Sequence, residues 1–144
     1  MIPLQTVFGS EIADLAFLLG RVLFGLVLAF NGLNHFMMAD GLAGYADAKG
    51  IPAAGFMVPF TGGLLLFGGL GVAAGVVPTL AAGALIVFLV VTTPVMHDFW
   101  AVPEDQQQSE MTNFLKNVAL LGGALVFFAL SATPWPYAVN ATLI

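Results

Sequence analysis

The chain of 144 residues contains no cysteine. It therefore cannot carry out dithiol–disulfide exchange, ligate an iron–sulfur cluster through thiolates or attach haem through thioether bonds. It has only two histidines, His35 and His97, and neither belongs to a His-x-x-His or Glu-x-x-His pair. Zinc or non-haem iron would need His35, His97 and Asp98 to meet from separate segments. We predict no metal site and no intrinsic cofactor.

Charge is scarce as well. Charged residues make up 8% of the sequence and hydrophobic residues 60%, whereas a soluble domain carries about 25% charged residues. The mean hydropathy is +1.00. These values favour a membrane protein over a globular enzyme, with the lipid bilayer as its surroundings. The net charge of −5 makes the surface a poor binder of nucleic acid.

Four segments are long and apolar enough to cross a membrane, which takes about 20 residues. The predicted helices are 12–38, 56–77, 79–100 and 112–132. They predict an all-α fold, an integral membrane four-helix bundle that forms a single domain over residues 1–144, multi-pass in the cell membrane. The first ten residues lack a basic region of the kind that opens a signal peptide, so we expect the first span to stay in the mature chain.

Four spans place both termini on one side of the membrane, here called side A. The loops 39–55 and 101–111 then lie on the opposite side, side B. Glycines in the second span, among them Gly68, Gly71 and Gly75, share one helical face. Such faces let helices approach closely in lipid. We expect this packing within the bundle, with a homo-oligomer through the glycine-rich faces as the alternative.

Polar side chains gather at the side-B ends of three predicted helices. In the first and fourth helices they are spaced i, i+3, i+4, which places them on one helical face. Polar groups at this depth normally turn inward, so we predict that these stripes meet in one pocket. For each residue alone, contact with headgroups or water is the alternative. The predicted ligand-binding residues are Asn31, Asn34, His35, His97, Asp98, Trp100, Asn113, Lys116 and Asn117.

Arg21 lies apart from this cluster, about two turns into the first span. An arginine inside a membrane is costly unless it is paired or reaches the interface. Asp14 is seven residues earlier, on roughly the same face. We predict a structural ion pair between Asp14 and Arg21, with contact to an anionic lipid or a substrate carboxylate as the alternative.

Three segments resemble the DoxX family. They are "RVLFGLVLAFNGLNHF", the mostly apolar stretch from Gly50 to Trp100, and "MTNFLKNVALLGGALVFF", so that the resemblance spans about residues 15–130. The family's signature falls here on Arg21, Gly32, His97, Phe99, Trp100, Lys116 and Asn117. Asn31-Gly32 and Asn34-His35 replace the His-Gly and lysine of the family's first helix, and Thr61 replaces a frequent acidic residue. These departures argue against a conserved proton-transfer role for the first two helices.

The resemblance implies a four-helix membrane protein linked to redox chemistry, because the family takes its name from a subunit of a thiosulfate:quinone oxidoreductase. The hypothesis is a subunit of a redox system whose side-B pocket takes a quinone or similar amphiphile. His97 would bond a carbonyl oxygen, Asp98 relay a proton and Lys116 stabilise negative charge, with Trp100 over the ring. The alternative is a non-catalytic scaffold or accessory subunit that docks other redox-complex subunits. Conduction of a small solute is the third hypothesis.

Overall fold

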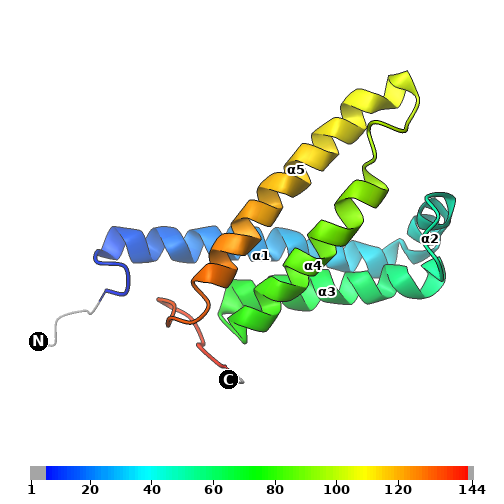
Figure 1. The fold of residues 1–144 in the computed structure, drawn as a ribbon. Helices are drawn as coiled ribbons and strands as arrows, with labels where there is room; N and C mark the ends of the chain where they lie inside the picture. Colours follow the sequence, from blue (N-terminus) through cyan, green and yellow to red (C-terminus); the bar gives the residue numbers. More distant parts are fainter. Residues whose placement is uncertain (1–5, 143–144) are drawn as a thin grey trace, which may run out of the picture.

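A computed structural model provides the architecture of the chain and describes residues 6–142. The described part contains five helices (Figure 1). They are α1 (Glu11–Met37), α2 (Ala39–Ala48), α3 (Ala54–Ala74), α4 (Pro78–Met96) and α5 (Glu104–Ala129). All except the short α2 are long and apolar enough to span a membrane. The predicted all-α membrane bundle is confirmed.

The spans form two antiparallel hairpins. α1 and α3 lie side by side, and α4 and α5 cross them at an angle (Figure 1). The hairpins are joined mainly where α4 packs on α3. They diverge toward the end of the molecule that carries α2 and the α4–α5 connection, which is side B (Figure 1).

Glycines hold α1 and α3 close together. A Cβ added at Gly25 would collide with the Gly69 carbonyl oxygen, and one added at Gly32 would lie 2.6 Å from that of Gly62. Both helices thus carry a glycine pair seven residues apart at the contact. Without side chains there, the backbones approach within van der Waals contact, which is how helices associate in lipid.

The predicted glycine face of α3 is also filled from within the chain. A Cβ added at Gly71 would meet the side chain of Ala81 at 2.6 Å, and one at Gly75 would meet that of Ala138 at 2.6 Å. The packing within the bundle that we expected is therefore present. By contrast, Gly122 on α5 has open space around it.

The side-A end is closed by the tail that follows α5. Trp135 is 1% exposed and packs edge-on against Phe17, with ring centroids 5.3 Å apart. Its indole N–H donates to the Leu130 carbonyl at 3.0 Å. A tryptophan buried in this way is part of the core rather than a membrane-interface anchor. The tail is also tied to the α3–α4 turn, where Val139 N–H donates to the Ala74 carbonyl at 2.9 Å.

The helix boundaries differ from the prediction by three residues or more at four places, one of which is the end of α5 at Ala129 instead of residue 132. α3 ends at Ala74 because Gly75 adopts a left-handed conformation with φ of 72°, which stops the helix. α4 ends at Met96, before the predicted end at residue 100. α5 begins at Glu104, well before residue 112, because Glu104 and Asp105 in its first turn suit the positive end of the helix dipole.

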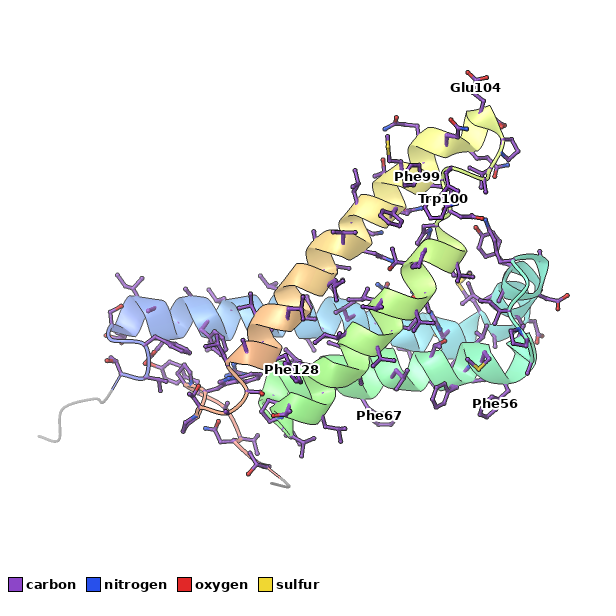
Figure 2. All side chains as sticks on the ribbon, viewed as in Figure 1. Phe56, Phe67, Phe99, Trp100, Glu104 and Phe128 are labelled. Carbon is purple, nitrogen blue, oxygen red and sulfur yellow. The ribbon has the colours of Figure 1, made fainter. Side chains whose placement is uncertain are left out.

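The predicted loop 39–55 contains α2. This short helix packs its apolar side on the start of α3, where Ala46, Ala54 and Val58 form a small buried cluster. Large apolar side chains elsewhere point outward, as Phe56 and Phe67 of α3 do in Figure 2. Phe67 is 71% exposed. An outer surface of this kind requires lipid around it.

Candidate functional site

A cavity of about 550 Å³ lies on the side-B half of the molecule, between the two hairpins. Its volume falls in the range of small-molecule sites. Its walls are mostly apolar and come from every helix. The lining residues are His35, Leu42, Tyr45, Ala46, Gly50, Ile51, Pro52, Met57, Val58, Phe60, Thr61, Leu64, Val87, Phe88, Val91, Thr92, Val95, Met96, His97 and Asn117.

The cavity opens toward the lipid. Phe60 of α3 and Val87 and Val91 of α4 line it, yet they are 49%, 57% and 60% exposed. They lie within the apolar parts of two spans. The exposed side chains of the cavity on α3 and α4 therefore lie at the depth of the apolar spans.

His35 occupies the wall formed by α1 and α3. Its Nδ1 lies 3.1 Å from the Val58 carbonyl oxygen and 3.2 Å from the Thr61 hydroxyl oxygen. Because a carbonyl oxygen can only accept a hydrogen bond, we assign the ring proton to Nδ1. Nε2 of the neutral ring is then a hydrogen-bond acceptor.

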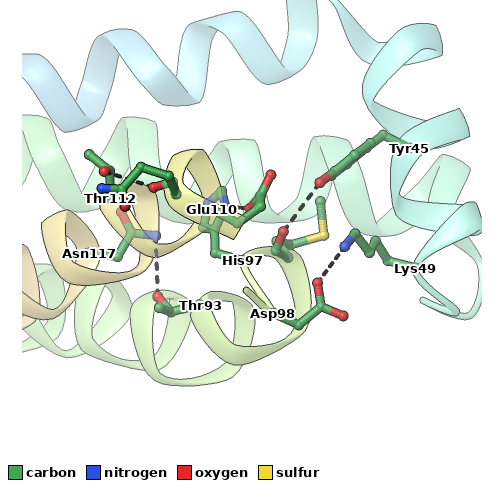
Figure 3. A network of polar contacts seen from close by, with 10 residues as sticks. Tyr45, Lys49, Thr93, His97, Asp98, Glu110, Thr112 and Asn117 are labelled. Carbon is green, nitrogen blue, oxygen red and sulfur yellow. Dashed lines mark hydrogen bonds and ion pairs between the residues drawn. The ribbon is translucent and has the colours of Figure 1, made fainter. Parts of the chain in front are cut away.

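His97 occupies the opposite wall, just past the end of α4. Its Nδ1 lies 2.8 Å from Oε2 of Glu110, which projects from α5 (Figure 3). A carboxylate also only accepts, so the ring proton is again assigned to Nδ1, and Nε2 is an acceptor while the ring is neutral. Glu110 fixes the orientation and the tautomer of the ring, in the way that a carboxylate orients a histidine in many active sites.

Two contacts fasten α2 to the end of α4 beside the cavity. Lys49 donates to the Asp98 carboxylate at 2.5 Å, and the Tyr45 hydroxyl donates to the Met96 carbonyl at 3.3 Å (Figure 3). The hydrogen bond from Lys49 holds the pKa of Asp98 below its ordinary value of 3.8, and it raises the pKa of Lys49 above 10.5. Both groups are thus charged at neutral pH, and the pair bridges the two hairpins.

Asn117 contributes the last polar group, from α5. Its side-chain amide donates to the Thr93 hydroxyl at 3.2 Å (Figure 3). This bond joins α4 and α5 at the depth of the cavity. Thr93 itself is 5% exposed and does not line the cavity.

The cavity takes in three of the nine predicted residues, namely His35, His97 and Asn117. The other six lie outside it. Asp98 is held by Lys49. Trp100 is 57% exposed and packs on Phe99 and Phe114 at the α4–α5 connection. Asn31 and Lys116 are exposed, while Asn34 and Asn113 are half-buried.

The prediction that His97 and Asp98 line one pocket together is corrected by this geometry. Asp98 follows the end of α4 and turns toward α2, where it pairs with Lys49, and Glu110 lies beside the imidazole of His97. Lys116 lies on an outward face of α5, one helical position from Asn117. A neighbour in sequence points about 100° away around a helix, and only one of the two can face the cavity.

The predicted ion pair of Asp14 and Arg21 is not formed in the described residues, which is a further correction. Asp14 accepts hydrogen bonds from the backbone N–H groups of Val7 and Phe8, at 2.9 Å each. Arg21, 1% exposed, donates to the carbonyls of Ala73, Pro136 and Tyr137 instead. Backbone groups at side A thus bind both charged side chains, while the buried Nε of Arg21 has no hydrogen-bond partner in the described residues. Arg21 fastens the tail to the bundle.

Several residues of the site carried no signal in the sequence. Glu110 falls in the predicted loop 101–111. Its contact with His97 depends on how far α5 extends toward side B. Thr61 is an isolated hydroxyl in an apolar helix, Thr92 is followed only by Thr93 in another, and Tyr45 belongs to the unpredicted α2. Only a periodic pattern on one helix can be read from sequence, and these residues meet across helices.

Within residues 6–142 there is no group of three histidine or acidic side chains placed to hold a metal ion. The fold and the site define the class of protein: a multi-pass α-helical membrane protein with a lipid-facing cavity. The chain belongs to the DoxX family, whose sequence profile matches residues 16–98. The match covers α1 to α4 and ends at Asp98, so α5 lies outside it. No curated protein and no solved structure gives a significant match to the chain.

Proposed function

We propose that this protein binds a quinone-like amphiphile in the cavity between its hairpins, as a subunit of a redox system of the cell membrane. The observation that carries the proposal is a cavity of about 550 Å³ that is open to lipid and holds two histidines on opposite walls. An apolar cavity with a few polar groups is typical of a small-molecule site. An aromatic ring with polar oxygens matches this distribution.

The side chains that line the cavity indicate which part of the ligand each would contact. The apolar walls of α3 and α4 hold the ring and the start of its tail, which leaves through the opening beside Val91. His35 and His97 bond the oxygens of the ring. Electrons pass between the bound ring and a partner subunit, because the chain offers no thiol and no metal-binding motif to carry them.

The test is to purify the protein in mild detergent and to quantify co-purified amphiphiles by mass spectrometry. We expect a stoichiometric amphiphile in the wild type and at least a roughly tenfold smaller amount in His97→Gln, since the amide cannot take the place of the imidazole between the cavity and Glu110. Lys116→Gln is the matched control because Lys116 is exposed and does not line the cavity. An empty wild-type protein, or equal amounts in both variants, would contradict the proposal.

One observation favours a second function, that of an accessory subunit. Only Ala124 and Phe127 are buried along α5, so this helix presents a long face for another membrane protein, with Gly122 in open space. In that role His97→Gln would retain its partners after purification. A variant that fills the open glycine, Gly122→Leu, would lose them.

A further inference from the structure

The polar side chains that line the cavity donate most of their hydrogens to other groups of the protein. Tyr45, Thr61 and Thr92 donate their hydroxyl hydrogens to backbone carbonyls, at 3.3, 2.8 and 2.6 Å. A hydroxyl has one hydrogen to give and two lone pairs to offer. Each of these oxygens is therefore left with the capacity to accept.

The two histidines follow the same rule. His35 gives its Nδ1 hydrogen to Val58 and Thr61, and His97 gives its Nδ1 hydrogen to Glu110. For neither ring does Nε2 have a protein partner in the described part of the chain. The cavity thus contains two aromatic nitrogens that can accept hydrogen bonds and cannot donate them while the rings are neutral.

The cavity-lining residues of the α2–α3 connection add no free backbone donor. Gly50 N–H donates to Asp47 at 3.0 Å and Ile51 N–H donates to Ala46 at 3.1 Å, while Pro52 has no N–H. Asn117 keeps one amide hydrogen beyond the one it gives to Thr93. Acceptors therefore outnumber donors clearly on the polar part of the lining.

We propose that the cavity selects an amphiphile whose ring carries hydroxyl groups, and so takes the hydroquinone in preference to the quinone. This inference rests on the proposed function and deepens it. The hydroxyls of a hydroquinone donate to Nε2 of His35 and of His97. A quinone has only carbonyl oxygens, which would face these lone pairs and leave acceptors unpaired on both sides. Sites built for one hydrogen-bonding pattern reject a ligand with the opposite pattern strongly.

This assignment reverses the role that the sequence suggested for His97, which was to donate to a quinone carbonyl. The difference comes from Glu110, whose carboxylate accepts the hydrogen bond from Nδ1–H of His97. Because the carboxylate fixes this tautomer, Nε2 of the neutral ring has a free lone pair and is suited to receive a hydrogen bond from a hydroxyl of the ligand.

The first experiment measures the affinity of the purified wild-type protein in lipid nanodiscs, at about pH 8, for three probes. They are a decyl-chain benzohydroquinone kept reduced under nitrogen, the corresponding quinone and the hydroquinone dimethyl ether. The ether keeps the shape and the oxygens but has no hydroxyl hydrogen. We expect the hydroquinone to bind at least roughly tenfold more tightly than either of the other two.

The second experiment tests the source of the preference. In Glu110→Gln the amide N–H can donate to Nδ1 of His97, which moves the ring proton to Nε2 and turns this atom into a donor. The preference for hydroquinone over quinone should fall at least about threefold. Glu104→Gln removes the same charge from the exposed start of α5, where Glu104 stands at the tip in Figure 2, and should leave the preference unchanged.

The outcomes separate this inference from the proposed function. Equal binding of all three probes, or tighter binding of the quinone, would overturn the preference and leave the amphiphile site in place. Absence of binding by all three would overturn both. An unchanged preference in Glu110→Gln would remove the role assigned to the carboxylate and overturn the assignment of His97 as an acceptor.

Discussion

Lys49 and Asp98 form the contact on which the side-B end of the cavity depends. They join α2, which covers the cavity, to the end of α4. Both side chains are partly exposed, so the pair adds little to the overall free energy of folding. Its importance lies in its position, because it connects the two hairpins at side B, where they diverge (Figure 1).

The pH range of this contact follows from the two pKa shifts. The pKa of Asp98 is lowered from 3.8, so its contribution is present above about pH 4 and is lost as the pH falls through the lowered pKa. The pKa of Lys49 is raised from 10.5, so its contribution is complete below that value and is lost above the raised pKa. The contact therefore stays constant from about pH 5 to 9.

This leads to a prediction for spin labels at Gly44→Cys on α2 and Gln107→Cys on α5, which are specific because the chain has no cysteine. Electron paramagnetic resonance should give one narrow distance distribution from about pH 5 to 9 and a broader one below about pH 3. Asp98→Asn should give the broad distribution at neutral pH. Asp47→Asn, an exposed change on α2, is the control. A narrow distribution in Asp98→Asn would show that α2 is held by other contacts.

At the scale of the helices, the contact of α1 with α3 sets the rigid half of the molecule. The glycine pairs at 25 and 69 and at 32 and 62 place the two backbones against each other. His35 follows Gly32 by one helical turn on α1, and its Cβ lies against Gly62. The close approach of the helices therefore also positions a side chain of the cavity.

The prediction at this scale concerns two glycines of α3. In Gly69→Ala the new methyl would lie 2.6 Å from the Ala29 backbone nitrogen and closer still to the Gly25 carbonyl oxygen, so the helices must separate. We expect a loss of about 1–3 kcal/mol in the free energy of unfolding, measured by denaturation in detergent. Gly63→Ala, which meets nothing within 4 Å, should be neutral or slightly stabilising. Equal effects of both would contradict the packing described here.

The spans could be predicted from the sequence, and the way they pack could not. Runs of apolar residues mark helices that cross a membrane, and α1 was placed within one residue at each end. The short α2 was missed because ten residues with two glycines give a weak periodic pattern. For the same reason the contacts of His97 with Glu110 and of Asp98 with Lys49 could not be predicted, since residues that meet across helices leave no common period.

At the scale of the whole molecule, the cavity exists because the hairpins are joined on side A and diverge on side B. Arg21 and Trp135 fasten the tail at side A. The α4–α5 hairpin leaves α1 and α3 at an angle, and α2 closes the end of the space (Figure 1). Val91 of α4 lines the cavity and is 60% exposed, and we propose that the amphiphile enters from the lipid beside it, between α3 and α4. The account therefore depends on that entrance.

The most direct measurement compares Val91→Trp with Val90→Trp for binding of the decyl-chain hydroquinone in nanodiscs. Both valines are exposed on α4, at 60% and 53%, but only Val91 lines the cavity. An indole at position 91 would fill the entrance. We predict that Val91→Trp lowers the affinity at least roughly tenfold and that Val90→Trp leaves it unchanged. Equal affinity in both variants would show that the amphiphile does not enter this cavity and would contradict the account.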